Sequence, residues 1–154
     1  MSGKVSLPDT IPEDSDLEVQ EIVRYWQSIH RNGELPDRRQ IDPCDIPDLL
    51  PGIALVDIER SPFRFKFRLL GERMNLYHGR NFTGRWLDEV FPHFDKTETP
   101  KDFIFVTEQG NPSYRLGRPL MTFEKSFIEM ERVFLPFRNG RASVDLVMAY
   151  TIFR

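Results

Sequence analysis

The residue types that most often carry out chemistry are few in this sequence, and each has a simpler explanation. His30 and His78 fall where predicted helices end, and a cation there interacts favourably with the helix dipole. His93 follows Pro92 in a polar stretch. We interpret the three histidines as capping or exposed residues, in preference to haem ligands at His78 or His93.

Candidates for covalent or general-base catalysis are also sparse. The sequence holds no Gly-x-Ser-x-Gly motif and no phosphate-binding Gly-x-x-x-x-Gly-Lys motif. Cys44 is the single cysteine, so an intramolecular disulfide and a cysteine-rich zinc site are both excluded. Glu131 and Asp145 lie on neighbouring predicted strands, where two carboxylates can approach each other. Because Arg132 and Arg141 stand beside them, we favour salt bridges at a hairpin over a catalytic pair.

Three aspartates with regular spacing, Asp42, Asp45 and Asp48, raise the question of a metal site. The glycine and the terminal glutamate of a calcium-binding loop are missing. Asp42 precedes Pro43, which is the usual order of an N-cap and the first residue of a helix. We therefore predict capping roles for the aspartates and no bound metal.

Composition and charge exclude several classes of protein. The chain has 154 residues and 13 phenylalanines, which is enough apolar material for one core. Its net charge of −3 does not favour nucleic acid as a partner. No run approaches the roughly 18 apolar residues of a membrane span, and the polar N-terminus lacks the apolar core of a signal peptide. With a single cysteine, these features predict a cytoplasmic protein without a membrane partner.

Local cations near residue 66 do not change the expectation about nucleic acid. Arg64, Lys66 and Arg68 alternate with Phe65 and Phe67. In a strand this alternation places the cations and the rings on opposite faces. A platform for stacked bases needs both on one face, so we expect no nucleic-acid partner.

The chain divides into three predicted parts. Residues 1–15 are polar and form a flexible lead-in. Residues 16–52 hold an N-terminal amphipathic helix and a connector rich in proline and aspartate, and residues 53–154 form a sheet-containing domain. The helix stops at Asn32-Gly33, and its apolar stripe either caps the domain's own core or forms a dimer surface, two roles that do not exclude each other. The stripe consists of Leu17, Val19, Ile22, Val23, Trp26 and Ile29.

Period-two alternation predicts five strands after this helix. The clearest case is the last strand, with Val144, Leu146, Met148, Tyr150 and Ile152 on one face. Turns at Ser61-Pro62 and Asn139-Gly140 make two antiparallel hairpins. The predicted strands are residues 53–59, 63–69, 114–123, 131–137 and 144–152, and the predicted short helices are residues 72–78, 86–91 and 101–109. This order predicts an α+β fold, a five-stranded antiparallel sheet with short helices over one face.

Three blocks of the sequence together resemble the PAS domains, in particular a branch of bacterial PAS proteins that often stand alone. The first block contains Tyr25-Trp26, Leu35-Pro36, Ile41-Asp42-Pro43, Asp45-Ile46-Pro47 and Leu49-Leu50-Pro51. The second contains Gly71, Gly79, Asn81, Thr83-Gly84-Arg85 and Leu87-Asp88-Glu89. The third contains Glu131-Arg132, Leu135-Pro136, Gly140-Arg141 and Val144-Asp145. The blocks run from about residue 25 to near the C-terminus.

The resemblance implies a small internal cavity and a sensory or interaction role without catalysis. We recognise no attached kinase, cyclase or DNA-binding domain, so a signal would pass to a protein partner. Haem sensors of the family use an axial histidine, and flavin sensors use a cysteine in a fixed motif. Cys44 precedes the first strand and does not match that cysteine. We therefore expect no cofactor, neither haem nor flavin.

A ligand pocket is the one functional site that we predict. Pockets of this kind are apolar with a few convergent polar groups. Tyr77, Tyr150 and Asn81 are the candidate polar groups. The candidate walls are Phe65, Phe67, Leu69, Leu76, Tyr77, Phe82, Leu87, Phe103, Val133, Leu135, Met148 and Tyr150. The alternative is that these side chains fill one another's space and leave no cavity.

Two functions follow from this pattern. The first is a non-enzymatic cytoplasmic sensor or adaptor, a homodimer that binds a small apolar ligand, a protein partner of a signalling pathway, or both. The alternative is a small α+β-cone enzyme that acts on an apolar metabolite, with Asp145 as a buried base. The alternation of the last strand places Asp145 on the face opposite its apolar residues, which argues against the enzyme.

Overall fold

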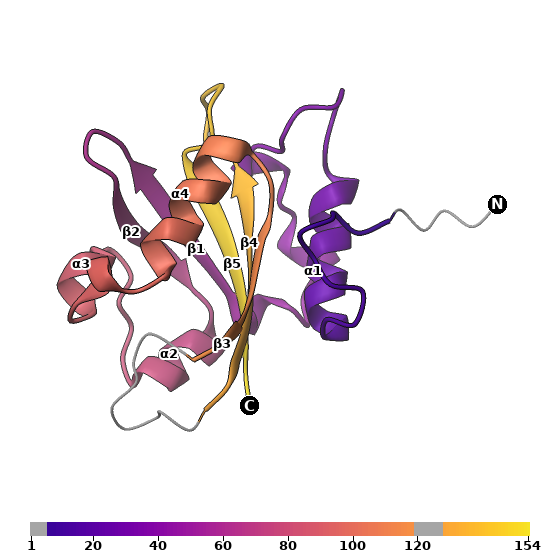
Figure 1. Ribbon diagram of the computed structural model, residues 1–154. Coiled ribbons are helices and arrows are strands. Elements are labelled where there is room, and N and C mark those ends of the chain that lie inside the picture. The colour runs from indigo at the N-terminus through magenta and orange to yellow at the C-terminus, as the bar shows by residue number, and fades with distance from the viewer. Residues whose placement is uncertain (1–5, 119–127) are drawn as a thin grey trace.

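The computed structural model describes residues 6–118 and 128–154, which form one antiparallel sheet with helices on both faces. The strands are Ile53–Glu59 (β1), Arg64–Leu70 (β2), Ser113–Gly117 (β3), Met130–Phe137 (β4) and Leu146–Phe153 (β5). They lie in the order β2-β1-β5-β4-β3, and each neighbouring pair is antiparallel (Figure 1). The predicted five-stranded sheet is confirmed. Of the segment predicted as strand 114–123, residues 119–123 lie outside the described residues.

The helices divide between the two faces of the sheet. They are Leu17–Ser28 (α1), Glu72–His78 (α2), Leu87–Val90 (α3) and Thr99–Gln109 (α4), with short 3-10 turns at Arg38–Gln40, Pro43–Asp45, Leu50–Gly52 and Phe94–Lys96. The helices α2, α3 and α4 lie on one side of the sheet and α1 lies on the other (Figure 1). The chain therefore has two apolar layers, one on each face of the sheet. We call the layers the cavity face, on the side of α2–α4, and the α1 face.

Local sequence explains where α1 begins and which side it buries. The Asp16 carboxylate accepts a hydrogen bond from the Glu18 backbone N–H at 2.8 Å, as an N-cap does. The predicted stripe packs on the sheet in the same chain, except Leu17, which is 79% exposed. The indole Nε1–H of Trp26 donates to the Pro136 carbonyl at 2.9 Å. The helix therefore caps the domain's own core, one of the two roles predicted for it.

The lead-in and the connector also belong to the α1 face. Ile11 is buried and Leu7 packs against the same layer, so the expectation of a flexible lead-in over residues 1–15 does not describe these residues. Ile11 and Leu7 hold this polar segment in place because each packs its apolar side chain against the α1 face. The Asp42 carboxylate accepts from the Cys44 N–H at 3.0 Å, which confirms its predicted capping role.

A bulge in β2 changes which residues face the core. Leu55 pairs with Leu69 and Val56 pairs with Phe67, so Arg68 is an extra residue in the ladder. Beyond the bulge the alternation is reversed. Leu70 is buried with the phenylalanines of β2, whereas Leu69, predicted as a pocket wall, is 48% exposed. The sequence carries no local signal for this bulge.

The connection between β4 and β5 is longer than predicted. The two strands form an antiparallel hairpin, but residues 138–145 connect them instead of a two-residue turn. Gly140 has a φ of 81°, which suits glycine. The Asp145 carboxylate accepts a hydrogen bond from the Asn139 N–H at 2.6 Å. Asp145 thus stabilises the loop backbone, because it accepts from an amide that the sheet ladder does not use.

Candidate functional site

A cavity of about 70 Å³ lies between the sheet and the helices α2, α3 and α4. Most of its surface is apolar, and it is lined from the sheet, from the three helices and from the segments between them. The described residues that line it are Ala54, Val56, Phe67, Met74, Tyr77, His78, Leu87, Phe91, Thr99, Phe103, Met130, Arg132, Phe134, Ala149, Thr151 and Phe153. An apolar hollow with a few polar groups is the usual form of a small-molecule site.

Helix α2 forms one wall because two glycines set its start and its end. At Gly71 a Cβ would clash with the Leu50 carbonyl oxygen, so only glycine allows this close approach. Gly79 has a φ of 79° and ends the helix in the left-handed conformation. Between them Met74 and Tyr77 face the cavity, and burial raises the pKa of Tyr77 to about 12.

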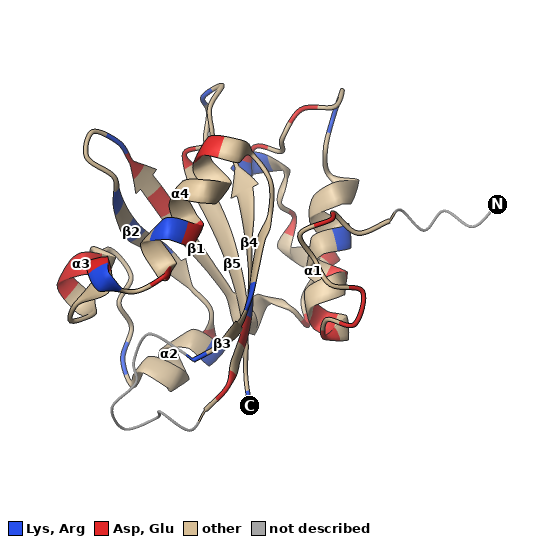
Figure 2. Cartoon of the chain, in the orientation of Figure 1, with Lys and Arg blue, Asp and Glu red and all other residues tan. Residues whose placement is uncertain are grey.

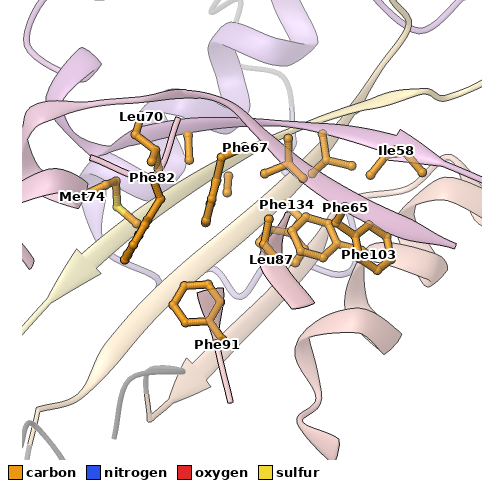
Figure 3. Close-up of a cluster of buried hydrophobic side chains, with 14 of the residues drawn as sticks. Ile58, Phe65, Phe67, Leu70, Met74, Phe82, Leu87, Phe91, Phe103 and Phe134 are labelled. Atoms are coloured by element: carbon orange, nitrogen blue, oxygen red, sulfur yellow. The ribbon is translucent and has the colours of Figure 1, made fainter. Parts of the chain in front are cut away.

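Aromatic rings make up much of the cavity face. The ring of Phe103 stacks on Phe65 with centroids 4.8 Å apart and on Phe134 with centroids 4.2 Å apart. Figure 3 shows these three rings grouped together, with Phe82 and Met74 at the other end of the cluster. Such rings are rigid and planar, and their stacking holds β2, α4 and β4 at a fixed distance.

A buried ion cluster forms the polar part of the wall. The Arg132 guanidinium donates to the Asp102 carboxylate and, at 3.2 Å, to the Thr99 hydroxyl. The Arg115 guanidinium binds the same carboxylate with two hydrogen bonds of 2.6 and 2.9 Å. Burial lowers the pKa of Arg132 to about 10, against the raising effect of Asp102. Arg132 also lies 4.2 Å above the Phe134 ring.

Six of the predicted pocket residues lie on the cavity face. Those that line the cavity are Phe67, Tyr77, Leu87 and Phe103. Phe65 and Phe82 belong to the same buried cluster but do not line the cavity. These residues sit on segments where one face is polar and the other apolar, so the alternation identifies the buried face.

Four predicted wall residues lie instead on the α1 face: Val133, Leu135, Met148 and Tyr150. The prediction that they line the cavity is wrong, because the strands β4 and β5 are apolar on both faces and their alternation does not say which face meets α2–α4. Tyr150 contacts α1, where its hydroxyl donates to the Glu18 carboxylate.

Three further predicted residues are exposed. Leu69 follows the bulge described above, and Leu76 is 74% exposed on the outer side of α2. Asn81 is exposed, and its side-chain oxygen accepts from the backbone N–H of Thr83 at 2.9 Å. A short helix such as α2 buries only one side, so Leu76 lies outside although it stands next to the cavity residue Tyr77.

Sequence reasoning missed the cavity residues that β4 and β5 supply. These are Met130, Arg132, Phe134, Ala149, Thr151 and Phe153. One signal was available: Arg132, next to Glu131, interrupts the mostly apolar strand β4, Thr151 interrupts β5, and the structure pairs Arg132 with Thr151 across the sheet. Buried polar residues in apolar strands point to a specific partner or ligand.

The remaining candidates for chemistry lie in different places. Glu131 faces α1, where its carboxylate accepts from the Tyr114 hydroxyl and from Arg154, both at 2.9 Å. Asp145 lies in the β4–β5 connection and does not line the cavity. Arg132 was predicted to form a salt bridge with a carboxylate of the hairpin. It pairs instead with Asp102 of α4.

The histidines and the acidic residues form no metal centre in the described part of the chain. His30 makes a 2.8 Å hydrogen bond to the Trp26 carbonyl at the end of α1. His78 lines the cavity beside Phe82 and Phe91, with ring centroids 5.4 and 5.5 Å away. Within residues 6–118 and 128–154, no group of three or more His, Cys, Asp or Glu residues is placed to hold an ion.

One aromatic residue joins the cationic side of β2, which the sequence did not indicate. Trp86 pairs with Lys66, and the Arg64 guanidinium lies 4.1 Å from the centre of the indole ring. Arg64 also forms an ion pair with Asp88 at 2.7 Å. Figure 2 shows this edge of the sheet and α3 carrying charges of both signs, whereas β5 carries none. The positive charges of β2 are therefore partly neutralised by neighbouring side chains such as Asp88.

The fold and the cavity agree with a comparison against protein families. The PAS domain family matches residues 15–150, so the chain belongs to the PAS domain family. This membership indicates a sensory or signalling role, and PAS domains are typically sensors rather than enzymes. A search of curated proteins finds no match. Among the helices that the structure describes, none has the length and apolar character that a membrane span demands.

Proposed function

We propose that this chain is a non-enzymatic sensor that holds a small, largely apolar ligand in the cavity between the sheet and α2–α4. The cavity itself carries the proposal: about 70 Å³ remains in a core of close-packed rings. A cavity of about 150 Å³ accepts benzene, so a ligand here is smaller unless the walls move. Empty space of this kind costs stability, and a ligand that fills it recovers the lost contacts.

A polar link between α2 and α1 supports a route for the signal. On α2, Met74 lines the cavity while the neighbouring Arg73 reaches the central strand β5. The Arg73 guanidinium donates to the Thr151 carbonyl at 3.0 Å and to the Glu18 carboxylate of α1 at 3.3 Å. Tyr150 donates to the same carboxylate. A ligand that moves α2 therefore changes a contact that α1 shares, and this biases the position of α1.

In this proposal the sensor works in the cytoplasm as a homodimer and passes its signal to a protein partner. It needs no haem, flavin or metal, and it contacts neither nucleic acid nor membrane. The helix α1 is the natural carrier of the output because it packs on the sheet and also touches α2 through Arg73.

Native mass spectrometry of the purified full chain, beside a denatured sample, tests the proposal. We expect a mass excess that disappears on denaturation, which gives the ligand's mass, and a main species of twice the chain's mass. A thermal-shift screen of small apolar compounds follows, and a ligand specific to the folded state raises the melting temperature. A bare mass together with no stabiliser in a broad library would contradict the sensing function. A bare monomer would contradict the homodimer alone.

A further inference from the structure

Besides Tyr77 and His78, the polar groups among the described residues that line the cavity are a buried cation and two hydroxyl groups, and these three lie together. Arg132 is 7% exposed and stands beside Thr151, its direct partner on β5. Thr99 begins α4 and accepts a hydrogen bond from Arg132. All three side chains line the cavity and are buried. We propose that the ligand is a short monocarboxylate whose head binds at Arg132 and whose apolar tail fills the cavity, an inference that rests on the proposed function.

The charges in this cluster do not cancel. Arg132 and Arg115 both bind the single carboxylate of Asp102. The nearby Glu98 is engaged by Lys101, 3.7 Å away on the surface. Two guanidinium groups and one carboxylate leave one net positive charge, shared between the buried Arg132 and the Arg115 side chain, which is 37% exposed. One anionic ligand group balances that charge, and burial makes the attraction stronger than it is in water.

The donors suit a carboxylate in particular. A guanidinium offers planar, paired N–H groups that match the two oxygens of a carboxylate. The hydroxyls of Thr99 and Thr151 can each donate to the same head group. None of the described lining residues is an aspartate or a glutamate, so none of these side chains repels an anion. A doubly charged phosphate would leave its second charge without a partner, and therefore a singly charged head is favoured.

The rest of the cavity limits the ligand's tail. Phe67, Phe91, Phe153 and Met74 form apolar walls and offer no donor or acceptor to a polar tail beyond weak ones. With about 70 Å³ available, the tail is a short alkyl chain of roughly two or three carbons, and an acid of roughly three or four carbons matches this space. A larger acid fits only if α2 moves outward.

Titration calorimetry on the full chain tests the inference with three probes of equal chain length: sodium butyrate, butyramide and 1-butanol. We expect butyrate to bind at least tenfold more tightly than the two neutral probes, because a hydrogen-bonded charge pair is lost with them. Arg132→Met should weaken butyrate binding at least tenfold and leave butanol unchanged. Arg64→Met, which removes an arginine on the outer face of β2, should change neither affinity.

Two substitutions keep the test decisive if Arg132→Met does not fold. Thr151→Val preserves shape but removes a hydroxyl, and should weaken butyrate binding about fivefold relative to butanol. Ala149→Leu fills the cavity and should abolish the binding of all three probes.

The outcomes separate this inference from the function on which it rests. If the neutral probes bind as well as butyrate, and the substitutions at Arg132 and Thr151 have no effect, the proposal of a carboxylate ligand is wrong. The proposal of a sensor for an apolar ligand is then unaffected. Failure of all three probes on folded protein would also overturn the carboxylate. In that case the mass excess and the thermal-shift screen decide the sensing function independently.

Discussion

The two faces of the sheet share the same central strands but are packed in different ways. The α1 face is covered by one helix of 12 residues, and its core is mainly aliphatic, with Val19, Ile22 and Leu135 fully buried. The cavity face is covered by shorter pieces, such as α2 with 7 residues and α3 with 4. Its core is rich in aromatic rings, with seven phenylalanines among 16 buried residues. The cavity lies on this second face.

This difference indicates how a small domain can combine a firm core with an adaptable site. Branched aliphatic side chains on a continuous helix interdigitate with a sheet and leave little space. Short helices that meet at angles leave corners that rigid rings cannot fill. Each face also holds a buried charge, Arg132 on the cavity face and Glu131 on the α1 face. The α1 face thus supplies stability, and the cavity face supplies the space in which we propose that a ligand binds.

The largest effect should come from removing a side chain on the α1 face. We expect Leu135→Ala to lower the free energy of unfolding by about 4 kcal/mol, because it opens a void in closed packing. Met74→Ala on the cavity wall should cost only about 2 kcal/mol, because that side chain already borders space. Urea denaturation of the two variants measures both. Equal losses would show that the faces are packed alike.

The buried charge sharpens the comparison. Asp102→Asn should lower the free energy of unfolding by about 3 kcal/mol, because Arg132 stays buried without its carboxylate. Glu131→Gln, on the α1 face, is the matched control. Its cation Arg154 is half-exposed and also pairs with Asp16 at 2.8 Å, so the loss should be smaller. Urea denaturation compares the two, and a larger loss in Glu131→Gln would contradict this account of the cavity face.

The link between the faces has a smaller expected effect. Arg73→Met removes the contacts to Thr151 and Glu18, and should cost about 1 kcal/mol. Hydrogen exchange of the α1 amides should become about fivefold faster, while the α4 amides stay unchanged. Arg68→Met, which breaks an exposed pair with Asp57, serves as control and should leave α1 unaffected. Unchanged exchange in α1 would falsify the proposed route between the faces.

The smallest effect concerns the acid stability of the α1 side. Burial alone would raise the pKa of Asp37, but hydrogen bonds from the Arg39 and Gly140 N–H groups hold it below its ordinary value of 3.8. A lowered pKa means that the unfolded state binds more protons, so the stabilisation is present above pH 3.8 and is lost as the pH falls through the folded pKa.

Asp37→Asn should therefore lose less stability than the wild type between about pH 5 and about pH 3. Urea denaturation at the two values checks this. The Arg64 hydrogen bond lowers the pKa of Asp88, which is exposed, despite the opposing effect of burial. The substitution Asp88→Asn therefore tests whether any carboxyl group with a lowered pKa gives the same dependence of stability on pH. Identical pH slopes in Asp37→Asn and the wild type would contradict the role of Asp37.

Much of the fold could be predicted because local sequence patterns indicate it directly. The alternation in β1 separates Ile53 and Leu55 from Ala54 and Val56, and the structure places the two sets on opposite faces. Gly79 predicted the end of α2, and the stripe of α1 predicted its buried side. In each case the signal lies within a few residues, where backbone geometry and solvent exposure act together.

Most of the candidate site could not be predicted, because the deciding contacts are distant in sequence; only four of its 16 described lining residues were predicted. In β2 the extra residue Arg68 reverses the alternation, so Leu69 turns outward and Leu70 turns inward. The ion cluster joins Thr99 and Asp102 of α4 to Arg115 and Arg132, which stand on different strands. No short pattern in the chain connects them.

The sequence by itself determined that this chain forms a five-stranded antiparallel sheet with an amphipathic helix before it, because alternation, caps and turns act locally. Only the tertiary structure decided which side of β4 and β5 faces the cavity. Both sides of these strands are mainly apolar, so the free energy gained by burial is similar whichever side faces the cavity. The positions of α1 and of α2–α4 resolve that choice, and they turn Arg132 rather than Glu131 toward the site.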